Sequence, residues 1–363
     1  MTDIKSEVTN SIGGITAYRS HIKKKKITVV ILIFLVFFFI LISINAGAAE
    51  LNPWKVFKTL IGITDEKANI VIWRIRMPRV IAAVVAGAGL SVAGCVMQNN
   101  LKNPLASPST LGIASAATFG ANLAIIVFGA GTVLNTAGDS VAINNPYIVT
   151  ICAFISSMSA IIIILGLAKL RSFSPEAIIL AGVALSSIFG AGITILQYFS
   201  SDIKIAAAIF WTFGDLGRVS WKEVIIISVI VLISIVYFSF KRWDYNALSN
   251  GEETAKSLGV NTNRVRFWGL LISALITSVA VSFLGMIGFV GLIGPQIMMR
   301  IVGADYRFLI PTSALMGSVI LLIADTAARI LISPIVLPVG ALTSLLGGPM
   351  FLYMLMRGTK GKK

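Results

Sequence analysis

Runs of about twenty apolar residues, separated by short polar breaks, occur along almost the whole chain. The first run, from Ile27 to Ala49, contains no charged residue and follows four consecutive lysines, Lys23 to Lys26. A helix of about 20 apolar residues spans the hydrocarbon of a bilayer and satisfies its own backbone hydrogen bonds. The runs are continuous, whereas the strands of a membrane β-barrel alternate. The sequence therefore predicts an all-α, polytopic membrane protein.

The spacing of these runs predicts about ten transmembrane helices in one bundle. The first run is longer than the apolar core of a signal peptide, and many spans follow it, so we expect a retained first helix. We divide the chain into a basic cytoplasmic tail at 1–26, a transmembrane domain at 27–357 and a basic cytoplasmic tail at 358–363. The helices are expected at 27–48, 80–98, 110–129, 147–167, 177–198, 223–240, 267–285, 287–302, 309–325 and 338–356.

The distribution of basic residues predicts the orientation of the bundle. Ten spans place both termini on one side, and 20 of the 30 lysines and arginines lie in segments on that side. Basic residues gather on the cytoplasmic side of membrane proteins, so both termini are expected there. The net charge of +15 then reflects topology and the lipid bilayer, and predicts no nucleic-acid partner.

Several classes of chemistry lack the residues that they require. The one histidine, His21, lies in the basic tail, and Cys95 and Cys152 stand alone in apolar segments, so no metal site and no cofactor are expected. No phosphate-binding loop of the G-x-x-x-x-G-K-[ST] type occurs, so any ATP is expected to be hydrolysed by another subunit. Only Glu223 and Asp325 are carboxylates within the predicted spans, near their outer ends. An ion-coupled transporter or a lipid-modifying membrane enzyme remains the less favoured alternative.

Four arginines depart from the charge rule, because they lie on the predicted outer side. Arg74, Arg76, Arg79 and Arg329 each stand close to the end of a predicted helix. They can anchor the helices at lipid headgroups. Alternatively they can bind an acidic partner from outside, because the guanidinium fork suits carboxylates.

Two further features have both a structural and a functional interpretation. Gly87, Gly94 and Gln98 lie on one face of the second span, where small residues allow close helix packing and Gln98 can line a polar path. The longest cytoplasmic loop, 241–266, predicts a short helix at Glu252 to Leu258 that ends at Gly259. Such a helix is either an interfacial spacer or a segment that enters a groove on a soluble partner.

The stretch RMPRVIAAVVAGAGLSVAGCVMQNNLKNPLASPSTLG closely resembles the FecCD family, the permease subunits of bacterial ABC importers for iron-siderophore complexes, haem and cobalamin. Ordered matches continue with LAGVALSS, GEETAKSLGV, IGFVGLIGP, PTSALMGS, LLIADTAAR and LPVGALTSLLGGPMFLYML. Together they cover residues 50–357.

The resemblance implies a type II ABC importer permease with ten helices. Its expected partners are a second permease chain, in a homodimer or heterodimer, a cytoplasmic ABC ATPase dimer and an extracytoplasmic substrate-binding protein. Arg76, Arg79 and Arg329 would then dock glutamates of the binding protein. The ATPase coupling loop would comprise Gly251, Glu252, Glu253, Ala255, Leu258 and Gly259.

Four positions depart from the family pattern. Gln296 stands where the family usually has histidine after proline, and Tyr306 stands at the histidine of an Asp-His-Arg motif. Ala116 replaces a glycine, and Val336 replaces a frequent acid. These departures favour, weakly, a heterodimer. The expected cargo is an iron chelate, most often a ferric siderophore in this family, with haem or cobalamin as the alternative.

Overall fold

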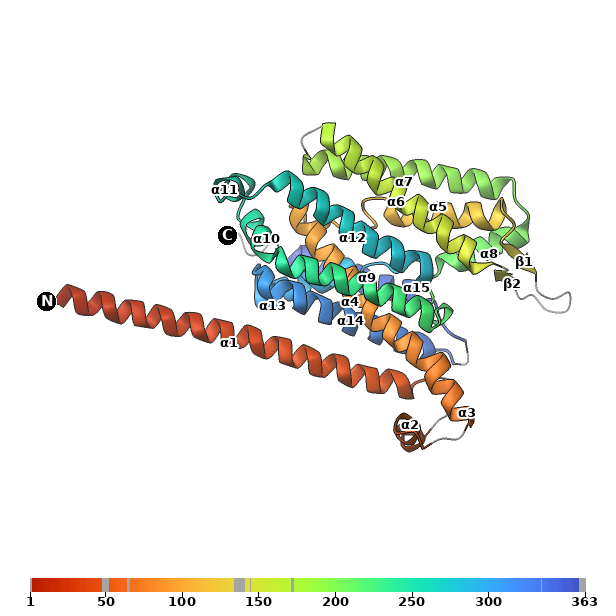
Figure 1. The fold of residues 1–363 in the computed structure, drawn as a ribbon, viewed down its shortest axis with the longest axis horizontal. Helices are drawn as coiled ribbons and strands as arrows, with labels where there is room; N and C mark the ends of the chain where they lie inside the picture. The colour runs from red at the N-terminus through yellow and green to blue at the C-terminus, as the bar shows by residue number, and fades with distance from the viewer. Residues whose placement is uncertain are drawn as a thin grey trace.

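The computed structural model describes residues 2–47, 52–63, 66–133, 141–143, 145–170, 173–333 and 335–358, and it is a helical bundle. Figure 1 shows the helices running roughly parallel to one long axis, with the two chain ends toward the same end of the bundle. The first half consists of α1 (Thr2–Asn45), α2 (Pro53–Leu60), α3 (Glu66–Asn69), the π-helical segment η1 (Ile70–Arg76), α4 (Met77–Asn100), α5 (Ile113–Ile126), β1 (Gly131–Val133), β2 (Val141–Ile143), α6 (Pro146–Leu170) and α7 (Pro175–Tyr198). The second half consists of α8 (Asp202–Thr212), the 3-10 turn η2 (Leu216–Arg218), α9 (Trp221–Phe240), α10 (Arg242–Ser249), α11 (Glu252–Ser257), α12 (Thr262–Leu284), α13 (Val290–Val302), α14 (Tyr306–Ile330) and α15 (Val339–Gly358).

The all-α fold and the ten expected spans are confirmed. In the described part of the chain, seven helices are long and apolar enough to cross a membrane, and α5, α13 and α15 are shorter apolar helices. Each of the ten lies where the sequence places a span. The short elements α2, α3, α8 and α10 and the antiparallel pair of β1 with β2 were not expected, because they are too short for a clear hydrophobic period.

The first helix, α1, is much longer than the predicted span. It has 44 residues and runs without a break through the basic segment Lys23 to Lys26. It lies beside α14 along one side of the bundle, and its first part extends past the other helices (Figure 1). Phe34 and Phe37 are exposed on its outward face, as expected for a helix that contacts lipid. Of the predicted C-terminal tail, only Gly358 lies within the described residues, as the last residue of α15.

Helix α4 forms the centre of the bundle, where α9, α12, α13 and α14 pack against it. Together with α3 and η1, which precede it, α4 forms one continuous helical run, Glu66–Asn100. In the most apolar stretch of this run, 78% is buried inside the protein. The corresponding stretch of α7 is only 11% buried. Leu180, Val183 and Ile188 are exposed on α7, which leaves this helix a broad apolar face toward lipid or another chain.

Glycines allow α4 to approach its neighbours closely. A Cβ on Gly87 would meet the backbone carbonyl of Gly317 in α14, and a Cβ on Gly94 would meet that of Gly291 in α13. Helices in lipid associate through such close packing of small residues. The face that the sequence assigns to packing or to a polar path is therefore, at Gly87 and Gly94, in backbone contact with two other helices.

We predict that Gly94→Ala destabilises the bundle, because the added methyl group meets backbone atoms of α13 and forces the helices apart. Overpacking of this kind costs about 1–3 kcal/mol or more. The matched control is Gly166→Ala in α6, where a Cβ has no neighbouring atom within 4 Å. Thermal unfolding in detergent should show a lower midpoint for Gly94→Ala and an unchanged or slightly higher one for Gly166→Ala. Equal midpoints for the two variants would contradict the close α4–α13 contact.

Candidate functional site

Three arginines meet at the end of the bundle where α1 ends and α4 begins, which we call the arginine end. Arg76 is the last residue of η1, Arg79 lies in the first turn of α4 and Arg329 lies in the last turn of α14. The packing of α4 along α14 brings these helix ends together. Their exposed fractions are only 4%, 9% and 6%, so all three side chains lie inside the protein.

Asp325 is the centre of this cluster. It is fully buried, accepts a hydrogen bond of 2.8 Å from Arg79 Nε and forms an ion pair of 3.0 Å with Arg329 Nε. A second atom of the same guanidinium group, Arg79 Nη2, forms an ion pair of 3.5 Å with Asp215. Buried charges of this kind are stable only when they are paired. The i, i+4 spacing of Asp325 and Arg329 is the one sequence signal that could have predicted this pairing.

The other contacts of Arg76 and Arg329 are made with the end of α1. Arg76 Nη1 donates to the carbonyl oxygens of Ile44, at 2.7 Å, and Asn45, at 3.2 Å. Arg329 Nη1 donates to those of Ser43, at 3.0 Å, and Ala46, at 2.6 Å. The last carbonyls of a helix lack backbone partners and carry partial negative charge, so cations stabilise them. The two arginines therefore fasten the end of α1 to α4 and α14.

Arg74 differs from these three residues. It lies two residues before Arg76 on η1 and is exposed, as is Lys67 on α3. The exposed positive charge at the arginine end is thus carried by residues around the buried cluster, while the predicted docking residues Arg76, Arg79 and Arg329 bind groups of the chain itself.

We predict that Asp325→Asn lowers the stability of the bundle by about 3–5 kcal/mol, because it leaves the buried Arg329 without a carboxylate and Arg79 with only the more exposed Asp215. Glu223→Gln is the matched control, since Glu223 caps the start of α9 in a more exposed position. Thermal unfolding of the two purified variants distinguishes them. A loss at Asp325 no larger than the loss at Glu223 would contradict the pairing.

The opposite end of the bundle carries the loop that the sequence predicts to contact an ATPase, and we call it the loop end. The short helix α11, Glu252–Ser257, lies where the sequence places it. The residue before this helix, Gly251, has a φ of +123°, and Gly259, shortly after the helix, has a φ of +81°. These backbone conformations favour glycine. Of the other predicted loop residues, Ala255 is buried, and Glu253 and Leu258 are exposed.

Glu252 fixes the position of α11. Hydrogen bonds from Lys256 and Arg266 lower the pKa of Glu252 to about 2. Its carboxylate therefore stays charged above the ordinary glutamate pKa, and the ion pairs would be lost only as the pH falls toward 2. Arg266 was not among the sequence-predicted residues, because nothing in its spacing from Glu252 indicates a contact.

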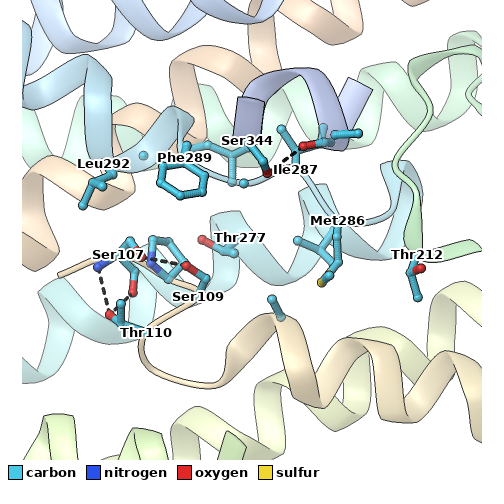
Figure 2. Close-up of a pocket in the computed structure, with 18 of the residues that line it drawn as sticks. Ser107, Ser109, Thr110, Thr212, Thr277, Met286, Ile287, Phe289, Leu292 and Ser344 are labelled. Carbon is cyan, nitrogen blue, oxygen red and sulfur yellow. Dashed lines mark hydrogen bonds between the residues drawn. The ribbon is translucent and has the colours of Figure 1, made fainter. Parts of the chain in front are cut away.

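A cavity of about 670 Å³ lies within the bundle, between α4, α12, α13, α15 and the segment 105–110. Hydroxyl groups of Ser107, Ser109, Thr110 and Thr277 line one part, and Met286 and Phe289 line another (Figure 2). Hydrogen bonds from the Ser107 backbone N–H to Thr110, at 3.0 Å, and between Ser107 and Ser109, at 2.8 Å, fix the loop wall. The described lining residues carry no charge. The space can hold an apolar or hydroxyl-rich molecule of several hundred daltons.

Gln98 lies one helical turn beyond Gly94, beside this cavity wall. Gln296 Nε2 donates to Gln98 Oε1 at 2.8 Å and to the Pro104 carbonyl at 3.2 Å. Gln98 is buried and points at the carbonyls of Gly291 and Leu292, each 3.4 Å away. Gln296, one of the departures from the family pattern, therefore joins α13 to α4 and to the loop that follows it. Among the described residues, no group of three or more His, Cys, Asp or Glu side chains is placed to hold a metal ion.

Comparison with known proteins gives consistent relatives across nearly the whole chain. A protein of Methanocaldococcus jannaschii, provisionally named an ABC transporter permease, is 54% identical over 94% of this chain and 97% of its own length. The hemin transport system permease protein of Yersinia pestis is 37% identical over 87% of this chain and 91% of its own. A solved transporter in an inward-facing conformation, provisionally classed as metal-chelate type, is 29% identical and superposes with a TM-score of 0.76. The match covers 92% of this chain and 99% of the chain of that transporter.

The match to a family model agrees with the resemblance that the motifs carry. The model of the FecCD transport family matches residues 34–357, which run from within α1 into the last turn of α15. The chain is a multi-pass membrane protein and a member of the FecCD transport family of ABC transporter permeases.

Proposed function

We propose that the chain is the transmembrane subunit of an importer that moves an iron chelate, most often a ferric siderophore in this family, across the cytoplasmic membrane. The observation that carries the proposal is the uncharged, mainly apolar cavity inside the bundle, part of whose wall carries hydroxyl groups. Its volume suits a chelate of several hundred daltons. The chelate's bound iron would stay enclosed in its own ligands, which is consistent with the lack of metal-binding groups among the described residues.

The proposed cycle uses both ends of the bundle. An extracytoplasmic binding protein delivers the chelate at the arginine end, and a separate ATPase dimer binds α11 at the loop end. ATP binding and hydrolysis there switch the cavity between outward and inward access. A second permease chain, identical or different, would pack on the exposed apolar face of α7 and complete the pathway.

Ion-coupled transport is less well supported by the geometry. Such transporters carry buried carboxylates that bind and release ions near the middle of the bilayer. Within the described spans, Asp325 is the fully buried carboxylate, and it is held between two arginines at one end of the bundle. Both oxygens of this carboxylate thus have an arginine partner, whereas an ion-binding carboxylate needs an oxygen open to the ion.

We predict that uptake of one chelate depends on this chain, on ATP and on the binding protein. The measurement is accumulation of labelled iron, offered as catecholate, hydroxamate and carboxylate siderophores and as haem, in cells that lack the chain and in cells with it restored. Loss and recovery of one chelate would identify the cargo. Uptake of cobalamin alone would replace the iron chelate with the alternative cargo, and ATP-independent uptake would contradict an ABC importer.

Docking of the binding protein at the arginine end is tested separately. We propose that Arg76, Arg79 and Arg329 form the docking face. The exposed Arg74 would lie at the rim of this face. Arg74→Glu should slow association of the binding protein by about fivefold to tenfold at low salt without a change in thermal stability, because a charge at an interface rim mainly affects the association rate.

The control for docking is Lys169→Glu, which makes the same change of charge at an exposed position near the end of α6. It should leave association unchanged. For the buried residues, Arg76→Gln and Arg329→Gln are expected to lower both affinity and thermal stability, because they also release the end of α1. Normal association of all three arginine variants would contradict docking at this end.

A further inference from the structure

Arg266 is a buried arginine at the loop end for which the sequence suggests no role. It lies in the first part of α12 and is only 1% exposed. Its guanidinium group contacts three separate segments: Nη2 donates to Glu252 of α11 at 2.7 Å, Nε to the Asn100 carbonyl at 3.2 Å and Nη1 to the Phe173 carbonyl at 3.3 Å. One side chain thus joins α11, the end of α4 and the turn between α6 and α7.

The contact with α4 replaces a hydrogen bond that the helix cannot make. The Asn100 carbonyl would ordinarily accept from the backbone N–H of residue 104, but that residue is Pro104, which has none. The buried side-chain amide of Asn100 has no hydrogen-bond partner among the described residues either. Arg266 is therefore the group that holds the last carbonyl of α4 in place.

The end of α4 leads directly into the cavity wall. Pro104 is followed by the segment 105–110, whose Ser107, Ser109 and Thr110 line the cavity (Figure 2). The same segment is attached to α13 through the hydrogen bond of Gln296 to the Pro104 carbonyl. A displacement of the last turn of α4 must therefore move this wall relative to α12 or strain its contacts.

The ion pair between Arg266 and Glu252 makes α11 part of the same unit. Separating the two would leave a charge buried without a partner, which costs several kcal/mol. The third contact, at Phe173, holds a residue with φ of +56°, a conformation that is unfavourable for a residue with a large side chain. The turn before α7 is thus fixed by the same guanidinium group.

We infer that Arg266 is the positioning residue that transmits movement of α11 to the cavity wall at 105–110, and through Phe173 to the start of α7. This inference rests on the proposed function, in which a partner ATPase moves α11. A displacement of Glu252 would draw Arg266 with it, and Arg266 would move the end of α4. Lysine cannot take this role, because a single ammonium group does not reach three acceptors in a planar arrangement.

The test uses the complete transporter, with both permease chains and the ATPase, reconstituted in vesicles with the binding protein. Arg266→Lys keeps the positive charge at residue 266. Glu252→Gln removes the negative charge of its partner, which is the more exposed member of the pair. For both variants, uptake of the chelate found in the panel above and ATP hydrolysis are measured in the same vesicles. The expected result is an approximately tenfold drop in chelate transported per ATP, with hydrolysis retained. Arg264→Lys, an exposed arginine two residues away, is the matched control and should keep the normal ratio.

A conformational measurement separates this role from a loss of stability. Ser109→Cys, in a background without Cys95 and Cys152, places a thiol in the exposed part of the cavity wall. Its rate of maleimide labelling should change when a non-hydrolysable ATP analogue is added. This response should be lost in Arg266→Lys and Glu252→Gln and kept in Arg264→Lys.

The outcomes distinguish the two proposals. A normal transport ratio and a normal labelling response in both variants, with an active unmodified chain, would overturn the role of Arg266 and leave the importer function intact. An unmodified transporter that moves no chelate with ATP would overturn both. If Arg266→Lys does not fold, Glu252→Gln alone decides the inference.

Discussion

Arginine side chains bind the last backbone carbonyls of two helices in this bundle, α1 and α4. At the end of α1, Arg76 and Arg329 bind the carbonyls of residues 43–46. At the end of α4, Arg266 binds the Asn100 carbonyl. Ser43, Ile44 and Asn100 are buried in the protein, so water does not satisfy such groups, and a buried carbonyl without a partner costs about 1–3 kcal/mol. Two of these guanidinium groups are also paired with carboxylates, Arg329 with Asp325 and Arg266 with Glu252. The arrangement of α1, α4, α11, α12 and α14 therefore follows from a small set of charge-assisted hydrogen bonds.

These bonds alter the meaning of arginines on the predicted outer side. The sequence offers two roles for these arginines, headgroup anchoring and docking. The structure gives Arg76 and Arg329 a third role, the attachment of α1. An arginine has five N–H donors, so internal bonds and an external carboxylate can share one guanidinium group. Docking of an acidic partner here would then compete with, or add to, the contacts that fix α1. The exposed charge of Arg74 can attract the same partner without this conflict.

The fold was predictable to the extent that hydrophobic length determines it. Every long span was located, because twenty consecutive apolar residues have one interpretation, and α11 was located because Gly259 stops a short polar helix. The site was less predictable, since its contacts join residues far apart in sequence: Arg79 with Asp325, and Arg266 with Glu252, Asn100 and Phe173. Among the ion pairs of the two ends, Asp325 with Arg329 and Glu252 with Lys256 have a local spacing, four residues, that indicates contact. Gln296 was noticed as a departure from a family pattern, yet its hydrogen bonds to Gln98 and Pro104 depend on how α13 crosses α4.

Helix α4 connects both ends of the molecule. Its first turn is held by Arg79 on Asp325, and its last carbonyl is held by Arg266, while Gly87 and Gly94 keep its middle in backbone contact with α14 and α13. A helix fixed at both ends and closely packed between them moves as a rigid body, because bending it would break internal hydrogen bonds that lipid cannot replace. An event at the arginine end and an event at α11 therefore act on the same element. The cavity wall follows directly after that element in the chain, so under the proposed function docking at the arginine end and movement of α11 would both change access to the cavity without any contact between the two partners.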